Sequence, residues 1–340
     1  MKYLLIILVS LGSLLSSTTA EVSNTTLLIG ATVIDGTGAE PRPNTAVLIE
    51  GAHIKAIGPL NEIKIPAGTK RIDITGKYLL PGFIDLHFHV MYPPNSDPQS
   101  DSLATVRAMH FMGMAVKSGV TAVRDTGATI EPMQALLKGQ ELGYFKSLRL
   151  YPVGQLITTI GGHATSWSHF ATGPYGFRDA VRKMYAAGFR YIKLSPMYTQ
   201  EEITAAIDEA KKLGMRVTTH GGGGSDTVPT SMTKMAVLAG TQGIEHLNPM
   251  EESVLDLIAE RGVHVVPTLD VYRRLYQNGS HKHLEEKGWK MEIHEELFKK
   301  ALAKKIIMGI GTDHVGFLMD EVYPGGYFDE MNYFVELGMS

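Results

Sequence analysis

The chain has 340 residues, of which 44% are hydrophobic and 20% charged, and its formal net charge is -3. This composition excludes a disordered or fibrous protein, and the length suits one barrel of roughly 250 residues with an appendage better than several small domains. The near-neutral charge argues against nucleic acid or an anionic membrane surface as a partner and favours a small molecule. Because cysteine is absent, disulfides, thiolate ligands and a cysteine nucleophile are excluded.

Residues 1–20 have the pattern of a cleaved secretory signal peptide. Lys2 supplies a positive start, Leu4 to Leu15 an apolar stretch, and Thr18-Thr19-Ala20 a small-residue ending. An uncleaved N-terminal anchor is the alternative, although the apolar stretch is short for a membrane span. We therefore expect a periplasmic or secreted protein that has no stable membrane anchor after signal cleavage.

Residues 21–80 are expected to form a small β domain. Apolar and polar positions alternate between turn signals, as in Ala46 to Glu50 and His53 to Ile57. This pattern predicts a small antiparallel β unit of the β-sandwich kind.

From residue 81 to 340, short apolar runs alternate with longer helical patterns, which is typical of βα units on a parallel sheet. Eight such units close an α/β barrel of the TIM type. A doubly wound open sheet is the alternative fold, but no Gly-x-Gly-x-x-Gly turn follows the first strand to support a dinucleotide site. The expected strands are Phe83 to Val90, Val120 to Asp125, Arg149 to Leu156, Tyr191 to Ser195, Arg216 to His220, Gly243 to Leu247, Val263 to Leu269 and Ile306 to Asp313, and helices include Leu103 to Ser118, Glu201 to Leu213, Pro229 to Ala239, Glu251 to Glu260 and Glu330 to Leu337.

His87 and His89 lie two residues apart at the end of the first of these strands. Side chains at that spacing project to the same side of a strand, so two neutral imidazoles can hold one metal ion together. A pair of buried, hydrogen-bonded histidines without a metal is the alternative.

Four more candidate ligands stand at or near the carboxyl ends of later strands: Lys193, His220, His246 and Asp313. In an α/β barrel these ends converge on one mouth, so residues far apart in sequence become neighbours in space. The arrangement predicts a metal centre with catalytic function.

These motifs resemble the amidohydrolase superfamily, and within it the prolidase-like and imidazolonepropionase-like branch. In that family two divalent ions, usually zinc, are bridged by a carboxylated lysine and a hydroxide. The resemblance implies that His87, His89 and Asp313 hold one ion, that His220 and His246 hold the other, and that Lys193 bridges them. The motifs occur in the family's order: Leu80-Pro81-Gly82-Phe83-Ile84-Asp85-Leu86-His87-Phe88-His89, Gly161-Gly162-His163, Ile192-Lys193, Thr219-His220, Ile244-Glu245-His246, Val266-Pro267-Thr268-Leu269 and Gly311-Thr312-Asp313.

Two of these residues need special chemistry. A lysine ammonium has no lone pair, so Lys193 must lose a proton and react with carbon dioxide to present carbamate oxygens. An ordinary ion-paired lysine, with a single metal elsewhere, is the alternative. Asp313 would both bind a metal and pass the proton of the attacking water to the leaving nitrogen, unless it only caps a helix or braces the strand ends.

Other residues give weaker signals. His163 is assigned to substrate or oxyanion contact, and otherwise to a hydrogen bond within its loop. Tyr198 is a candidate substrate contact, with a loop position and a solvated hydroxyl as the alternative. Arg124 is expected to pair with Asp125 or Glu245. The cluster of His281, His283 and His294 is expected in a solvated loop rather than at a second metal site.

The predicted function is hydrolysis of a C–N bond in a small amide, lactam or dipeptide such as Xaa-Pro, by a metal-bridging hydroxide with Asp313 as proton shuttle. The alternatives are a lactonase or organophosphate-type ester hydrolase on the same site and a non-catalytic small-molecule-binding barrel. A homo-oligomer is compatible with the sequence. Because family members continue past the eighth strand to complete the small β domain, we expect a truncated product or partial sequence; a stop codon directly after Ser340, with a soluble and active product, would refute this.

Overall fold

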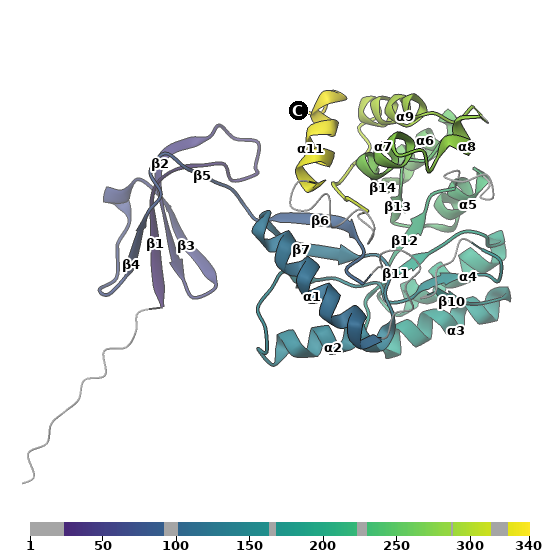
Figure 1. The fold of residues 1–340 in the computed structure, drawn as a ribbon, viewed down its shortest axis with the longest axis horizontal. Coiled ribbons are helices and arrows are strands. Elements are labelled where there is room, and N and C mark those ends of the chain that lie inside the picture. The colour runs from purple at the N-terminus through teal and green to yellow at the C-terminus, as the bar shows by residue number, and fades with distance from the viewer. Residues whose placement is uncertain (1–23, 92–100, 163–167, 223–229, 287, 314–325) are drawn as a thin grey trace, which may run out of the picture. The chain divides into compact units, whose positions relative to one another are not determined.

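The structure is a computed structural model that describes residues 24–91, 101–162, 168–222, 230–286, 288–313 and 326–340 (Figure 1). The segment predicted as a signal peptide and His163 lie outside the described residues. The chain divides after Pro81 into two compact units, which are described separately.

The first unit contains one five-stranded sheet and a 3-10 turn, η1. Strand β1 pairs with β2, and β2 with β3, in antiparallel fashion, whereas β4 and β5 both run parallel to β1. The prediction of an antiparallel unit is therefore wrong for β4 and β5, because residues 59–69 lead the chain back to the start of β1 and allow parallel pairing. A second sheet, which a sandwich requires, is not found among the described residues of this unit. The bounds are β1 Thr25–Val33, β2 Arg42–Glu50, β3 His53–Gly58, η1 Leu60–Glu62, β4 Lys70–Asp73 and β5 Tyr78–Leu79.

The second unit is built on two parallel sheets, which confirms the α/β class. One sheet has the order β6-β7-β8 and the other the order β10-β9-β11-β12-β13-β14. The central strands β7, β11, β12 and β13 are short and mostly buried, as expected where helices cover a parallel sheet. The bounds are β6 Phe83–Phe88, β7 Val120–Asp125, β8 Arg149–Leu150, β9 Leu156–Thr158, β10 Ser168–Phe170, β11 Tyr191–Leu194, β12 Arg216–His220, β13 Gly243–Glu245 and β14 His264–Val266.

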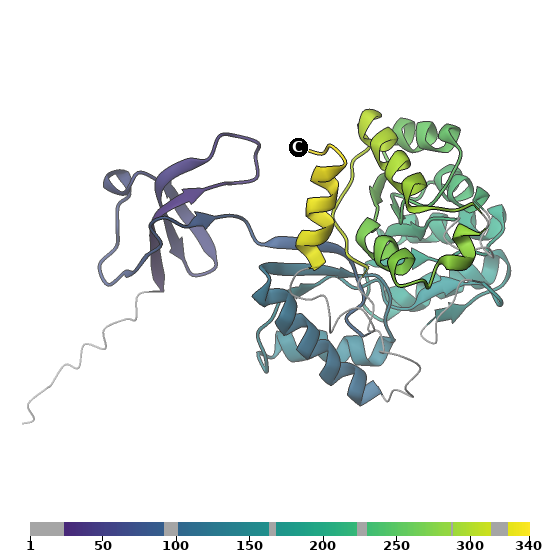
Figure 2. The same ribbon diagram turned by 45° about the horizontal axis from the view of Figure 1, so that its top comes forward.

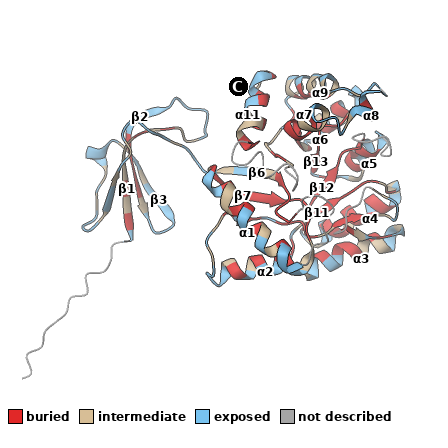
Figure 3. Ribbon diagram, in the orientation of Figure 1, coloured by how far each residue is buried: buried red, intermediate tan, exposed pale blue. Residues whose placement is uncertain are grey.

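The helices of this unit lie around its strands (Figures 1 and 2) and turn their buried residues toward them (Figure 3). Helix α4 illustrates the local signals, because Thr199 and Glu202 form a reciprocal capping box at its start. Among the described residues, no helix has the length and apolar character that a membrane crossing requires. The bounds are α1 Asp101–Lys117, α2 Ile130–Glu141, α3 Gly173–Ala186, α4 Gln200–Lys212, α5 Ser231–Ala239, α6 Glu252–Arg261, α7 Leu269–Gln277, α8 Lys282–Glu285, α9 Met291–Ala303 and α11 Gly326–Glu336.

The expected last strand, residues 306–313, forms only one isolated bridge, between Val265 and Met308. Its backbone nevertheless forms hydrogen bonds with the strands on both sides of it. Gly309 N donates to Val265 O of β14, while Leu86 N of β6 donates to Ile310 O. The approach is close: a Cβ at Gly311 would lie 2.3 Å from a Val266 methyl carbon. The segment therefore runs between β14 and β6 without a regular ladder.

The expected third strand is also irregular. Residues 149–158 form two short strands, of which β8 pairs with β7 and β9 pairs with β11. Residues 149–158 are thus hydrogen-bonded to both parallel sheets, and so are residues 306–313.

Candidate metal centre

The centre begins with His87, the residue before the last of β6, and His89, just beyond that strand. Both imidazoles are buried, and each directs Nε2 at the same carboxylate oxygen. The distances to Asp313 Oδ1 are 3.2 Å from His87 Nε2 and 3.3 Å from His89 Nε2. The Asp313 backbone N–H donates to the His87 carbonyl at 2.7 Å, so the two chain segments are fixed to each other at this point. Among the described residues these three form the group able to hold a metal ion.

The other three predicted ligands join the same cluster. Lys193 Nζ lies 3.1 Å from His87 Nε2. The His246 ring centroid is 4.7 Å from that of His87 and 4.4 Å from that of His220. Adjacent strands carry Lys193 and His220, β11 beside β12, and His246 directly follows β13, which lies beside β12, so their carboxyl ends bring these three side chains together.

Burial and neighbouring groups shift the pKa values of these residues. It lowers the pKa values of Lys193, His89 and His246, because water no longer stabilises their protonated forms. Burial alone would raise the pKa of Asp313, but the nearby His87 and His89 hold it well below its usual range. Imidazole nitrogens and a carboxylate are ligands that zinc and similar divalent ions prefer.

Backbone strain is concentrated at this centre. His246, Thr268 and Asp313 have φ angles of 71°, 52° and 48°, three of the five described non-glycine residues with positive φ. Such conformations cost roughly 1–3 kcal/mol each and persist where the surroundings impose them. The strain aims the side chains of His246 and Asp313 into the cluster.

A buried carboxylate behind His87 determines which of its nitrogens faces the cluster. Glu245 Oε2 lies 2.7 Å from His87 Nδ1, and because a carboxylate only accepts, Nδ1 carries the hydrogen. The Nε2 lone pair is then directed at the site, as in carboxylate–histidine–zinc arrangements. Glu245 Oε1 accepts hydrogen bonds from Arg124 and Thr218. Of the two partners expected for Arg124, the structure therefore supplies Glu245.

His246 is oriented in a similar way. Its Nδ1 lies 2.7 Å from the Thr268 hydroxyl, which leaves Nε2 as the nitrogen able to bind a metal. Sequence reasoning missed the roles of Thr268 and Glu245. The available signal was their place in the motifs that carry the ligands, since Glu245 directly precedes His246.

Two further aspartates brace the loops of the centre. Asp85 accepts the backbone N–H groups of His87 and Thr312, both at 3.1 Å, and thus ties the histidine strand to the Asp313 segment. Asp125 accepts the N–H groups of Val90 and Gly127, and burial raises its pKa to about 7.

The weaker candidates differ in position. Tyr198 is buried, and its hydroxyl donates to the Met232 carbonyl at 3.2 Å instead of lying in water; substrate contact by this residue remains a prediction. The solvated-loop interpretation is wrong for His294, which belongs to α9 and is buried because its ring stacks on Tyr272 at 4.7 Å. His163 lies outside the described residues.

Comparison with known proteins agrees with this geometry. The profile of the Amidohydrolase family matches residues 78–339. The chain is 23% identical to ochratoxinase of Aspergillus niger over 347 residues, which cover 86% of this chain and 70% of the relative. It is 26% identical to imidazolonepropionase of Salinispora arenicola, over 67% of this chain and 63% of the relative. The crystal structure of a Xaa-Pro dipeptidase with bound methionine superposes with a TM-score of 0.80 and 25% identity, over 93% of this chain and 84% of the dipeptidase.

Proposed function

Because this chain belongs to the amidohydrolase family, whose members here are hydrolases of C–N bonds, we propose that its substrate is a small amide, lactam or dipeptide, such as an Xaa-Pro dipeptide. The observation that carries the proposal is the convergence of Lys193 and Asp313 on the histidine pair, with 3.1 Å between Lys193 Nζ and His87 Nε2. The relatives named above include a dipeptidase and an imidazolonepropionase, which supports this substrate range.

The proposed framework is a closed TIM-type barrel. Support comes from the two segments that connect the parallel sheets, residues 149–158 and 306–313, and from the similarity to the dipeptidase fold. In such a barrel the carboxyl ends of the strands form the active-site mouth.

Two divalent ions, proposed to be zinc, fit the donor set. His87, His89 and Asp313 would hold one, and His220 and His246 the other. Such ions activate a water molecule near neutral pH and polarise a carbonyl group.

Lys193 is proposed to bridge the ions as a carbamate. In its uncharged form the amine would attack the carbon of carbon dioxide: a C–N bond forms, one C=O π pair moves onto oxygen to give the carbamate anion, and the nitrogen loses one proton to water. The burial that lowers the Lys193 pKa supports this step, because it favours the free amine.

Asp313 is proposed to move the proton. Its ionised carboxylate can accept a proton from the attacking water and deliver it to the departing nitrogen, since an amide anion is a poor leaving group. The Asp313 side chain is 17% exposed, whereas that of His89 is 7% exposed and that of His87 has no exposed surface, so a substrate can reach Asp313 most readily of these three. His163 remains a proposed contact to the substrate or its oxyanion.

The proposal is tested by measuring metal content per chain together with hydrolysis of a substrate panel. The panel contains N-acyl amino acids, Xaa-Pro dipeptides, lactones and organophosphate esters. Two ions per chain and turnover of the amides are expected. Turnover of only the lactones or esters would support the ester hydrolase instead, and ligand binding without turnover of any compound would support the binding barrel.

Export of the chain is a separate proposal that rests on residues 1–20. N-terminal sequencing of the protein purified from its source should find a start at Glu21. An intact Met1 would contradict signal cleavage.

A further inference from the structure

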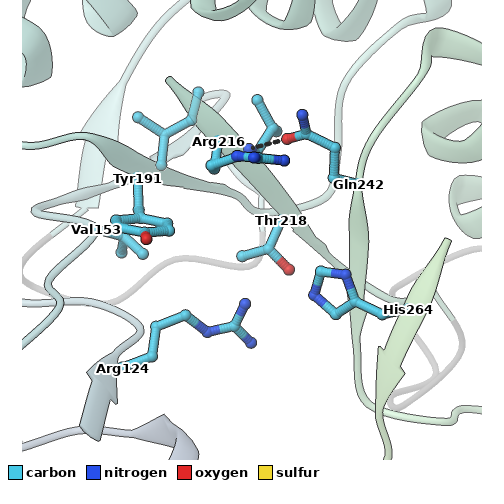
Figure 4. Close-up of a pocket in the computed structure, with 9 residues that line it drawn as sticks. Arg124, Val153, Tyr191, Arg216, Thr218, Gln242 and His264 are labelled. Carbon is cyan, nitrogen blue, oxygen red and sulfur yellow. Dashed lines mark hydrogen bonds between the residues drawn. The ribbon is translucent and has the colours of Figure 1, made fainter. Parts of the chain in front are cut away.

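A second polar site is a pocket whose lining includes the first residues of three strands (Figure 4). Tyr191, Arg216 and His264 are the first residues of β11, β12 and β14, whereas the candidate ligands stand toward the carboxyl ends. The pocket has a volume of about 320 Å³, at the lower end of the range for small-molecule sites. Its lining residues are Arg124, Val153, Tyr191, Ile192, Arg216, Val217, Thr218, Gln242 and His264.

The pocket is lined by cationic groups and by no carboxylate. Arg124 is buried and directs its guanidinium toward Thr218 and His264 (Figure 4). The nearby carboxylate is Glu245, which does not line the pocket and already accepts from Arg124, Thr218 and His87. Arg216 has no ion pair with any carboxylate in the described part of the chain. Its charge is therefore available to a ligand.

The glycine at position 243 leaves space for the His264 imidazole that lines the pocket. A Cβ at Gly243 would lie 2.4 Å from His264 Nε2 and 3.0 Å from the Thr218 hydroxyl, so a larger residue there would displace the ring. Burial lowers the pKa of His264, and the positive charge of Arg124 lowers it further. The Glu245 carboxylate acts in the opposite direction and raises the pKa of His264.

Donor groups complete the site. The Gln242 Oε1 atom accepts the Val217 N–H at 2.7 Å, which holds the side chain in place and leaves its NH2 group to donate. Guanidinium groups match the oxygens of carboxylates and phosphates in paired hydrogen bonds. The donors come from different strands, Arg124 from β7, Arg216 from β12 and His264 from β14, so the sheet framework fixes their spacing.

We propose that this pocket binds a small oxyanion, a carboxylate or a phosphate group, separately from the hydrolytic site. Arg216 and Arg124 would hold the anionic oxygens, and His264 and Gln242 would donate further hydrogen bonds. None of its lining residues is a candidate metal ligand, although Arg124 and Thr218 bond to Glu245, which in turn bonds to His87.

Calorimetric titration of the metal-loaded enzyme with inorganic phosphate, and separately with succinate, tests the proposal. Arg216→Gln should weaken binding at this site by about tenfold to a hundredfold, the effect of losing hydrogen bonds to a charged group. Arg149→Gln is the matched control, since Arg149 is an exposed arginine at the start of β8 that does not line the pocket. It should leave binding unchanged. The stronger of the two titrations identifies phosphate or carboxylate as the preferred group.

Phosphate also binds divalent ions, so the variants separate the two sites. A binding signal that Arg216→Gln removes and Arg149→Gln retains belongs to the pocket. A signal that both variants retain belongs to the metal centre, and equal weakening in both reflects general charge; either result overturns the proposal, as does an absence of binding in the wild type. Should Arg216→Gln not fold, Arg216→Lys and His264→Gln test the same site, and each should weaken binding.

Discussion

The two ends of the parallel strands in the second unit carry polar side chains of different chemistry. At the carboxyl end, nitrogen donors surround the Asp313 carboxylate, and His246 and Asp313 have positive φ angles. Elsewhere, Arg216 at the start of β12 and Arg124 near the end of β7 line a pocket whose lining residues include no carboxylate. One region therefore suits a cation and the other an anion.

The same strands supply both ends. Strand β12 begins with Arg216 and ends with His220, and β11 begins with Tyr191 and carries Lys193 as its third residue. Glu245 lies between the two regions, because it bonds to Arg124 on one side and to His87 on the other. The two regions are therefore connected through the buried Arg124–Glu245 ion pair.

The largest expected effect follows from breaking the carboxyl end at Asp313. Asp313→Asn removes the proton acceptor but keeps an oxygen that can face a metal, so turnover should fall by about 10³-fold while much of the metal remains. Steady-state kinetics on the best amide of the panel, with metal analysis of the same sample, measure both. Undiminished hydrolysis would end the proposed proton-transfer role.

A somewhat smaller loss is expected at Lys193. Lys193→Ala removes the bridging group, and turnover should fall on the order of 10²–10³-fold, together with the metal content. Added propionate should restore part of both, because its carboxylate can replace the carbamate oxygens. Rescue by propylamine in place of propionate would instead identify an ordinary ion-paired lysine.

The buried residue His294 allows a test of stability against pH. Burial lowers the pKa of His294 from 6.5 to about 4, and its Nδ1 lies 3.0 Å from the Leu247 carbonyl oxygen. Between these values the unfolded chain binds a proton that the folded chain does not, so the free energy of unfolding should fall as pH drops from 6.5 to 4. The largest decrease in the free energy of unfolding that this pKa shift can cause is about 3 kcal/mol.

The matched variant is His294→Gln, which keeps a donor for Leu247 but does not titrate. Denaturant unfolding of both proteins at several pH values gives the difference in free energy of unfolding, in which the other titrating groups largely cancel. A difference that stays constant from pH 7 to 4 would show that His294 does not titrate in this window.

The sequence predicted most of the parallel strands because apolar runs, glycines and strand-end polar residues follow local rules. Val120–Asp125 and Arg216–His220 have the predicted bounds. Residues 306–313 lack a ladder because Gly311 packs directly against Val266 and His87, a tertiary contact that no local pattern specifies. The role of Glu245 could not be predicted for the same reason, because it depends on tertiary contacts of the Glu245 carboxylate with residues of β6 and β7.

The last prediction concerns the link between the two regions. Burial alone would raise the pKa of Glu245, but Arg124 and His87 lower it, so the group is an anion that accepts on both oxygens. In Glu245→Gln only one side-chain oxygen remains. If it faces Arg124, the amide NH2 points at His87 Nδ1 and favours the tautomer whose hydrogen sits on Nε2; if it faces His87, the NH2 opposes the guanidinium.

Both arrangements weaken the metal centre without removing a ligand. Metal affinity, measured by competition with a chelator, should fall about tenfold to a hundredfold. Glu330→Gln is the control, because Glu330 is also buried, accepts the N–H groups of Leu269 and Asp270, and has a pKa raised by burial to about 8, so an amide resembles its protonated form. Equal loss of metal affinity in the two variants would mean that Glu245 acts through general stability. A loss confined to Glu245→Gln would show that the carboxylate sets the His87 tautomer, and so that the cationic region helps to position a ligand in the other.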